Sequence, residues 1–403
     1  MLNPGQESNC GFGANPDENL NADLPCGATS DSASVTATPA AARIATRAVA
    51  STLATPVAPT PARAPVAAPA PDARASRLRV FDLHCDTLVS LFNTGEPNQF
   101  VFSDFTQQTE LEMPASRSLN QNDLQVSLQR MQTIDWCQCF AVFIPEQFSG
   151  ELAWHFYRQI KRSFDRQLLD HADRMAQVIN ATDIEEVLAA RQCAALLTIE
   201  GAAFLQNSLD HIDDLAADHV KMLALTWNNQ NALASGTQAT GGLTNFGRQA
   251  VRALQQHQIV IDVSHLNDQS FNDLTAATEG PLVASHSNSR AVCDHPRNLT
   301  DAQFRTICER GGLVGLNFHN DFITTEQRRA TPDDLLRHID HWLTLDGMHC
   351  IALGSDYDGA DLPDWINSCD KLPDLYNHVQ RAFDSTIADR LFFANAQRFW
   401  QRH

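Results

Sequence analysis

The chain has 403 residues, a formal net charge of −19 and 43% hydrophobic residues. This length admits one large domain with an extension, and the hydrophobic fraction supports a sizeable core. The acidic balance argues against a nucleic-acid partner, which requires a basic surface, and no run of about twenty apolar residues predicts a membrane span.

Residues 1–76 differ in composition from the rest of the chain. From Thr36 to Ala75 nearly every residue is Ala, Pro, Thr, Val or Arg. Such a segment buries too little apolar surface to offset its ordering entropy. We therefore predict a disordered N-terminal extension at 1–76 and one folded domain at 77–403. Because the stretch contains arginines and few acids, a targeting peptide is the alternative.

The ten cysteines are scattered along the chain without CxxC pairs. In a chain long enough to build its own core, such cysteines are typical of small buried side chains rather than of a disulfide framework. The start of the chain also lacks a signal-peptide pattern. Together these features predict a reducing, cytoplasmic location.

Short apolar runs rich in β-forming residues alternate with segments of helical period. This alternation predicts a parallel sheet covered on both faces, and eight units in about 320 residues predict a closed (β/α)8 barrel. An open doubly wound sheet is the alternative, but no GxGxxG turn follows the first run. The predicted strands are Val80–Thr87, Cys137–Pro145, Ala194–Gly201, Lys221–Trp227, Ile259–His265, Pro281–His286, Gly312–His319 and Cys350–Asp358. Predicted helices include Ser208–His219, Phe246–Gln256, Asp268–Ala276, Thr300–Arg310 and Pro332–Leu345.

The first predicted strand carries two residues of the types that bind metal ions. His84 and Asp86 are two residues apart, so on a strand they project from the same face. An imidazole beside a carboxylate suits a divalent ion with nitrogen and oxygen ligands. A simple hydrogen-bonded pair is the alternative.

Other polar residues end the later strands. Glu200, His265, His286 and Asp356 each stand at such a position. In a (β/α)8 barrel the active site lies at the carboxyl ends of the strands. Three imidazoles and two carboxylates can hold two divalent ions if one carboxylate bridges them. Asp358 lies two residues after Asp356, but before Gly359 we expect it to shape the turn.

The chain resembles the membrane dipeptidase (renal dipeptidase) family of zinc peptidases, within the amidohydrolase-like metal barrels, over residues 78–402. The resemblance rests on five motifs: Asp82–Asp86, Thr198–Gly201, Asp262–His265, Ser285–Asn288 and Gly354–Gly359. It implies two zinc ions, one held by His84 and Asp86 and the other by His265 and His286. Glu200 would bridge the two ions.

The resemblance also implies roles for three residues around the metals. Arg297 would bind the free carboxylate of the substrate, for which a planar guanidinium is well suited; capping of the local backbone is the alternative. Asp356 would lie beside the attacking water and transfer its proton. Trp227 stands where mammalian members carry a histidine thought to polarise the scissile carbonyl. We expect Trp227 to shape the substrate pocket, with a buried core position as the alternative.

The predicted function is therefore zinc-dependent hydrolysis of dipeptides with a free C-terminal carboxylate, through a hydroxide bridging the two ions. The resemblance also suggests a homodimer. One alternative is another hydrolase of the metal-barrel class, acting on N-acyl amino acids, cyclic amides or lactones. The other is a non-catalytic binding protein on the same barrel.

Overall fold

The computed structural model describes residues 77–92 and 116–403, except residue 207. The extension predicted at residues 1–76 lies outside the described residues. Within the described residues no helix is both long and apolar enough to cross a membrane.

Eight parallel strands close into a barrel. β1 pairs with β2 on one side and with β9 on the other, and β2 pairs with β4. From β4 to β9 each strand pairs with the next, so the ring has no open edge. This confirms the predicted (β/α)8 barrel. The barrel strands are β1 (Arg79–Cys85), β2 (Asp135–Phe143), β4 (Cys193–Glu200), β5 (Val220–Ala224), β6 (Val260–Asp262), β7 (Leu282–Ala284), β8 (Leu313–Leu316) and β9 (Ile351–Leu353).

A ninth strand, β3 (Met175–Gln177), lies outside this ring. It pairs with β4 from Cys193 to Ala195, whereas β5 pairs with β4 from Leu197 to Glu200. β3 was not among the predicted strands, because its residues Met175–Gln177 include no β-branched or aromatic side chain.

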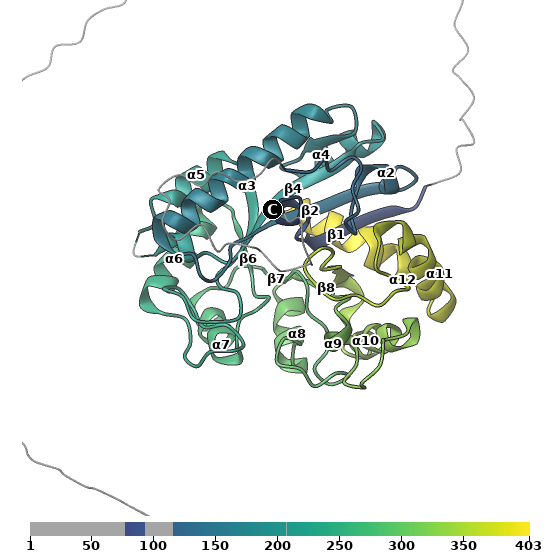
Figure 1. Cartoon of the computed structure of the whole chain (residues 1–403). Coiled ribbons are helices and arrows are strands. Elements are labelled where there is room, and N and C mark those ends of the chain that lie inside the picture. The colour runs from purple at the N-terminus through teal and green to yellow at the C-terminus, as the bar shows by residue number, and fades with distance from the viewer. Residues whose placement is uncertain (1–76, 93–115, 207) are drawn as a thin grey trace, which may run out of the picture. The chain divides into compact units, whose positions relative to one another are not determined.

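Helices lie outside the strands, as Figure 1 shows for α3 to α10. Five of them match the predicted helices to within a few residues: α5 (His211–Ala217), α6 (Asn245–Gln256), α7 (Asp268–Ala277), α8 (Asp301–Glu309) and α10 (Pro332–Thr344). The others are α1 (Thr87–Ser90), α2 (Leu128–Met131), α3 (Gly150–Asp170), α4 (Ala181–Ala189), α9 (Asn320–Ile323), α11 (Leu372–Ala382), α12 (Ser385–Asp389) and α13 (Asn395–Trp400).

Helix α10 shows how the sequence specifies these helices. Thr331 and Asp334 form a capping box, and Pro332 occupies the first turn, where its missing N–H is not needed. The buried residues Leu335, His338, Ile339 and Trp342 follow helical spacing, so one face packs inward.

The barrel interior begins with an apolar layer. One cluster of buried side chains takes one or two residues from each of the eight barrel strands, including Leu196 of β4, Val260 of β6 and Val283 of β7. The same cluster includes Phe399 and Trp400 of α13, and α13 contacts β1, β8 and β9. Polar residues follow the apolar ones toward the carboxyl ends of the strands, where the candidate site lies.

Candidate metal centre and substrate cavity

The barrel brings the predicted metal ligands together at the carboxyl ends of its strands. His84 lies in β1 and Glu200 ends β4, while His265 follows β6 and His286 follows β7. All four residues are at least nine-tenths buried, as are Asp86 and Asp356.

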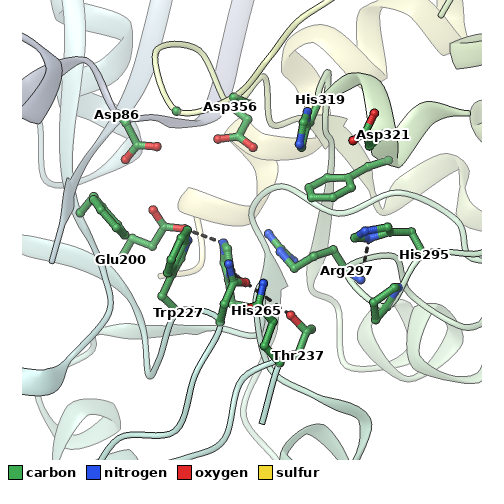
Figure 2. A pocket seen from close by; sticks show the side chains of 17 residues that line it. Asp86, Glu200, Trp227, Thr237, His265, His295, Arg297, His319, Asp321 and Asp356 are labelled. Carbon is green, nitrogen blue, oxygen red and sulfur yellow. Dashed lines mark hydrogen bonds and ion pairs between the residues drawn. The ribbon is translucent and has the colours of Figure 1, made fainter. Parts of the chain in front are cut away.

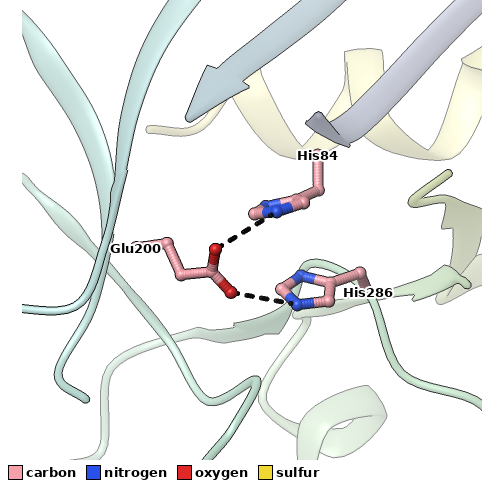
Figure 3. Close-up of side chains that lie close together, drawn as sticks. All are labelled: His84, Glu200 and His286. Atoms are coloured by element: carbon pink, nitrogen blue, oxygen red, sulfur yellow. Dashed lines mark ion pairs between the residues drawn. The ribbon is translucent and has the colours of Figure 1, made fainter. Parts of the chain in front are cut away.

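The carboxylate of Glu200 lies close to three imidazoles. Its Oε2 is 3.7 Å from His84 Nε2. Its Oε1 is 2.6 Å from His265 Nε2 and 3.4 Å from His286 Nε2. Figure 3 shows the carboxylate beside the rings of His84 and His286, with one oxygen directed toward each ring. Each carboxylate oxygen therefore faces different imidazoles, as a bridging ligand would, and the rings of His84 and His286 stack with centroids 3.9 Å apart.

On the other side of His84 lie two more carboxylates. His84 Nε2 is 3.4 Å from Asp86 Oδ2 and 3.9 Å from Asp356 Oδ1. Asp86 is not a strand residue as predicted, because β1 ends at Cys85 and Asp86 precedes α1. Its carboxylate nevertheless reaches the same space. Gly359 makes room there, since a Cβ at this residue would lie 2.0 Å from Asp86 Oδ2.

Two of the histidines are held with one nitrogen facing Glu200. His265 Nδ1 is 2.9 Å from Asn228 Oδ1, and His286 Nδ1 is 2.7 Å from Ser285 Oγ. Burial lowers the pKa of both imidazoles well below the usual value. Neutral histidines whose second nitrogen is hydrogen-bonded are the usual form of histidine ligands to metals.

The carboxylates are crowded in a buried space. Burial raises the pKa of Glu200 well above its usual value, and Asp86 adds to this rise. Burial lowers the pKa of His84, yet the neighbouring carboxylates, first Asp86 and then Glu200, raise it to about 10. A bound cation would relieve this concentration of negative charge.

The donor set fits divalent ions. It offers three imidazoles and three carboxylates, the ligand types of zinc sites. Within the described residues, His84 Nε2 and Asp86 Oδ1 are buried without a hydrogen-bond partner. Two groups have ligand atoms close enough to share an ion: His84 with Glu200 and His286, and His84 with Asp86 and Asp356. His265 adjoins the first group through its contact with Glu200.

A cavity of about 360 Å³ opens onto these residues. Arg297 contributes a buried positive charge to its wall (Figure 2). Its Nη2 donates to the carbonyl of His286 at 3.5 Å, its Nε has no hydrogen-bond partner among the described residues, and its guanidinium carbon lies 5.5 Å from the ring centre of Phe322. The cavity is lined by Asp86, Phe143, Glu200, Trp227, Asn228, Thr237, Gln238, His265, His295, Pro296, Arg297, His319, Asp321, Phe322, Asp356, Gly359 and Ala360.

Trp227 forms part of the wall of this cavity (Figure 2). Its side chain is half-buried. The ring lies 5.8 Å from that of His265 and edge-on to Phe143 at 5.2 Å. Its position at the cavity favours a pocket-shaping role over a place in the core.

Several supporting residues were not predicted from the sequence. Asn228 contacts His265 as described above, and Asn317 Nδ2 donates to Asp356 Oδ2 at 3.0 Å. Both follow the end of a barrel strand, so the rule that located the histidines could also have found them. Asp358 accepts from Thr87 Oγ1 at 2.6 Å and from the backbone of Gln125 at 2.6 Å, so its carboxylate joins segments that are distant in the chain.

Comparison with known proteins finds a family that matches the whole barrel. Residues 73–403 match the family described as membrane dipeptidase (peptidase family M19). An uncharacterised dipeptidase of Schizosaccharomyces pombe is 25% identical over 82% of this chain and 76% of its own length. A protein encoded in the pqqA 5′ region of Klebsiella pneumoniae is 35% identical over 59% of this chain and 94% of its own length.

Solved structures agree in fold. The crystal structure of dipeptidase AC, a metallopeptidase of family M19, superposes with a TM-score of 0.71 at 25% identity, covering 81% of this chain and 100% of that one. A metallopeptidase from Rhodobacter sphaeroides also superposes with a TM-score of 0.71, at 24% identity, over 81% of this chain and 99% of that one. The chain belongs to the membrane dipeptidase family of metallopeptidases, peptidase family M19.

Proposed function

We propose that this chain is a zinc dipeptidase that holds two ions and cleaves dipeptides with a free C-terminal carboxylate. One observation carries the proposal: Glu200 faces His84 with Oε2 and faces His265 and His286 with Oε1, in the same cavity as the buried Arg297. His84 and Asp86 would hold one ion, His265 and His286 the other, and Glu200 both.

Bound zinc ions would polarise the peptide carbonyl and lower the pKa of a water molecule. Asp356 would accept the proton of the attacking water and deliver it to the leaving amine. Its position supports this role, because Asn317 holds Oδ2 while Oδ1 faces His84. Asp356 also adopts a left-handed backbone with φ of 63°, a costly conformation that the surrounding contacts must maintain.

Arg297 would select the substrate. Its guanidinium can donate two parallel hydrogen bonds to a carboxylate, and its burial strengthens such a pair by excluding water. Anchoring of the free C-terminal carboxylate there would distinguish a dipeptidase from an endopeptidase. Trp227 would form the wall beside the bound side chains.

The experiment measures how fast the purified protein cleaves dipeptides, dipeptide amides, N-acetyl amino acids and lactones. We expect metal-dependent cleavage of dipeptides to be the fastest reaction, with dipeptide amides much slower. Faster turnover of lactones or N-acetyl amino acids would replace the dipeptidase assignment with the alternative hydrolase class. Failure to cleave any of them with metals bound would favour a binding protein.

The homodimer and the cytoplasmic location are part of this proposal. Sedimentation analysis would check the first, and cell fractionation the second. Comparing the full chain with a chain that lacks residues 1–76 would test the predicted domain boundary. We expect equal melting temperatures, because a segment without an apolar core contributes few tertiary contacts.

A further inference from the structure

Behind His286 lies a buried series of hydrogen bonds with no role in the reaction proposed above. Ser285 Oγ is 2.7 Å from His286 Nδ1 and is also hydrogen-bonded to Oδ2 of Asp262. The other carboxylate oxygen of Asp262 accepts from the backbone N–H groups of Ser264 at 2.9 Å and Ser285 at 3.0 Å. Asp262 and Ser285 are 3% and 0% exposed, so water does not compete for these bonds.

The single hydroxyl proton of Ser285 decides which nitrogen of His286 carries hydrogen. A serine hydroxyl donates one hydrogen bond and accepts up to two. Asp262, as a carboxylate, can only accept, so the hydroxyl donates to Asp262. The hydroxyl oxygen must then accept from His286, whose Nδ1 therefore carries the hydrogen. A neutral imidazole has one N–H, so Nε2 keeps its lone pair. This nitrogen faces Glu200 Oε1 at 3.4 Å and His265 Nε2 at 3.0 Å.

The same carboxylate–serine pair occurs at a second place in the barrel, without a histidine ring at its end. The backbone N–H and the hydroxyl of Ser355 donate to Asp82 at 2.8 and 2.6 Å. There the hydroxyl also lies 3.1 Å from the backbone carbonyl of His84. This second pair joins the ends of β1 and β9, so it serves as a matched control for the pair that joins β6 and β7.

We propose that Asp262 and Ser285 are positioning residues that fix His286 with hydrogen on Nδ1 and thereby increase the affinity of Nε2 for a metal ion. The affinity part rests on the proposed function. The position of the hydrogen does not, since it is a property of the protein without metal.

Asp262→Asn tests this inference because an amide can be accommodated in only one way. Its oxygen must replace Oδ1, which accepts from two backbone N–H groups. Its NH₂ then faces Ser285 Oγ and donates to it, so the serine proton turns toward His286 Nδ1 at 2.7 Å, which is closer than the other partner, Ser264 Oγ, at 3.3 Å. The hydrogen of the imidazole moves to Nε2, which must lose it before it can bind a metal.

The experiment uses the full chain labelled with ¹⁵N-histidine and has two readouts. The first is the tautomer of His286 in metal-free protein by NMR, with its signal assigned by loss in His286→Gln. The second is zinc affinity by competition with a chelator. In the wild-type chain we expect hydrogen on Nδ1. Asp262→Asn should move it to Nε2 and weaken one zinc equivalent by about 10- to 100-fold, the range for lost outer hydrogen bonds to a histidine ligand.

Ser355→Ala is the control for a general loss of stability. It removes the corresponding hydroxyl at β9, and we expect a lower melting temperature with the His286 tautomer unchanged. If Asp262→Asn does not fold, Ser285→Ala takes its place and should also weaken one zinc equivalent. Hydrogen on Nε2 in the metal-free wild-type chain, or unchanged zinc affinity in the folded variants, would overturn the inference. A wild-type chain that binds no zinc would refute the proposed function, while its tautomer still tests the hydrogen-bond series.

Discussion

The two ends of the barrel interior are built from the same strands but differ in chemistry. In β6 the inward residue changes from Val260 in the apolar cluster to Asp262, and after β7 it changes from Val283 to Ser285. In each case the switch takes two residues, because alternate residues of a strand share a face. The first residues of a strand can therefore pack in the apolar core, while its last residues carry the polar side chains of the site.

This division separates the sources of stability from the sources of function. The apolar end stabilises the barrel whether or not an ion is bound, because its contribution comes from buried hydrocarbon surface. The polar end buries several carboxylates whose charge requires compensation. Substitutions at the two ends should therefore have different effects on unfolding and on metal binding.

The largest effect is expected at Glu200. In Glu200→Gln a neutral amide replaces the carboxylate that faces His84, His265 and His286. The amide cannot offset two nearby cations. We expect loss of bound metal and a fall in dipeptide turnover on the order of 10³-fold, from several kcal/mol of lost transition-state stabilisation. Elemental analysis and steady-state kinetics measure both. A variant that keeps two ions and most of its turnover would show that Glu200 does not bridge.

A substitution at the opposite end should affect stability alone. Phe399 is 3% exposed, belongs to the inner apolar cluster and lies edge-on to Trp400 at 5.2 Å. Phe399→Ala should lower the free energy of unfolding by about 3–5 kcal/mol, the usual loss for a buried phenylalanine. Urea unfolding measures this loss. Below the unfolding transition the variant should bind as much zinc as the wild-type chain, and a reduced metal content there would show that the two ends are coupled.

Arg297→Ala should have an intermediate effect that depends on the substrate. Removing a charged hydrogen-bond donor costs about 1.5–3 kcal/mol, which corresponds to roughly 10- to 150-fold in kcat/KM for dipeptides. Dipeptide amides lack the carboxylate and should lose much less. Equal losses for both substrate types, or an unfolded variant, would assign Arg297 a structural role.

The smallest effect on rate is expected at Trp227. An indole N–H donates one hydrogen bond but carries no charge, so we expect Trp227→His to keep its metals and to change dipeptide turnover by at most about tenfold, roughly 1.4 kcal/mol. Trp227→Ala should change side-chain preference more than rate, because the ring lines the cavity. An unchanged profile across a panel of dipeptides would contradict the pocket-shaping role.

The barrel and its ligand positions could be predicted because they follow simple periodic rules. Parallel strands end at the same rim, so Glu200 and the histidines could be placed there from sequence order. The same rule places Asn228 and Asn317 near that rim, but it does not show which ligand each of them contacts. Asn228 meets His265 because the chain turns sharply there, with a left-handed φ of 72° at His265. Such local turns depend on tertiary contacts rather than on sequence period.

Helix α3, in contrast, could have been predicted from the sequence. Phe156, Ile160 and Phe164 are buried along it at intervals of four residues, so the helical period was present in the sequence although this helix was not among those predicted. The end of β1 illustrates the uncertainty of element boundaries. Asp86 lies beyond the strand, yet its carboxylate reaches His84.

The metal content of the full chain tests the central claim most directly. Protein purified in the presence of excess divalent metal and then freed of unbound ions should contain two equivalents per chain by elemental analysis, because the two oxygens of Glu200 face different imidazoles. The double variant His84→Ala and His265→Ala loses one imidazole facing each oxygen of Glu200. It should contain less than one equivalent. A wild-type chain without bound metal under these conditions would contradict the account.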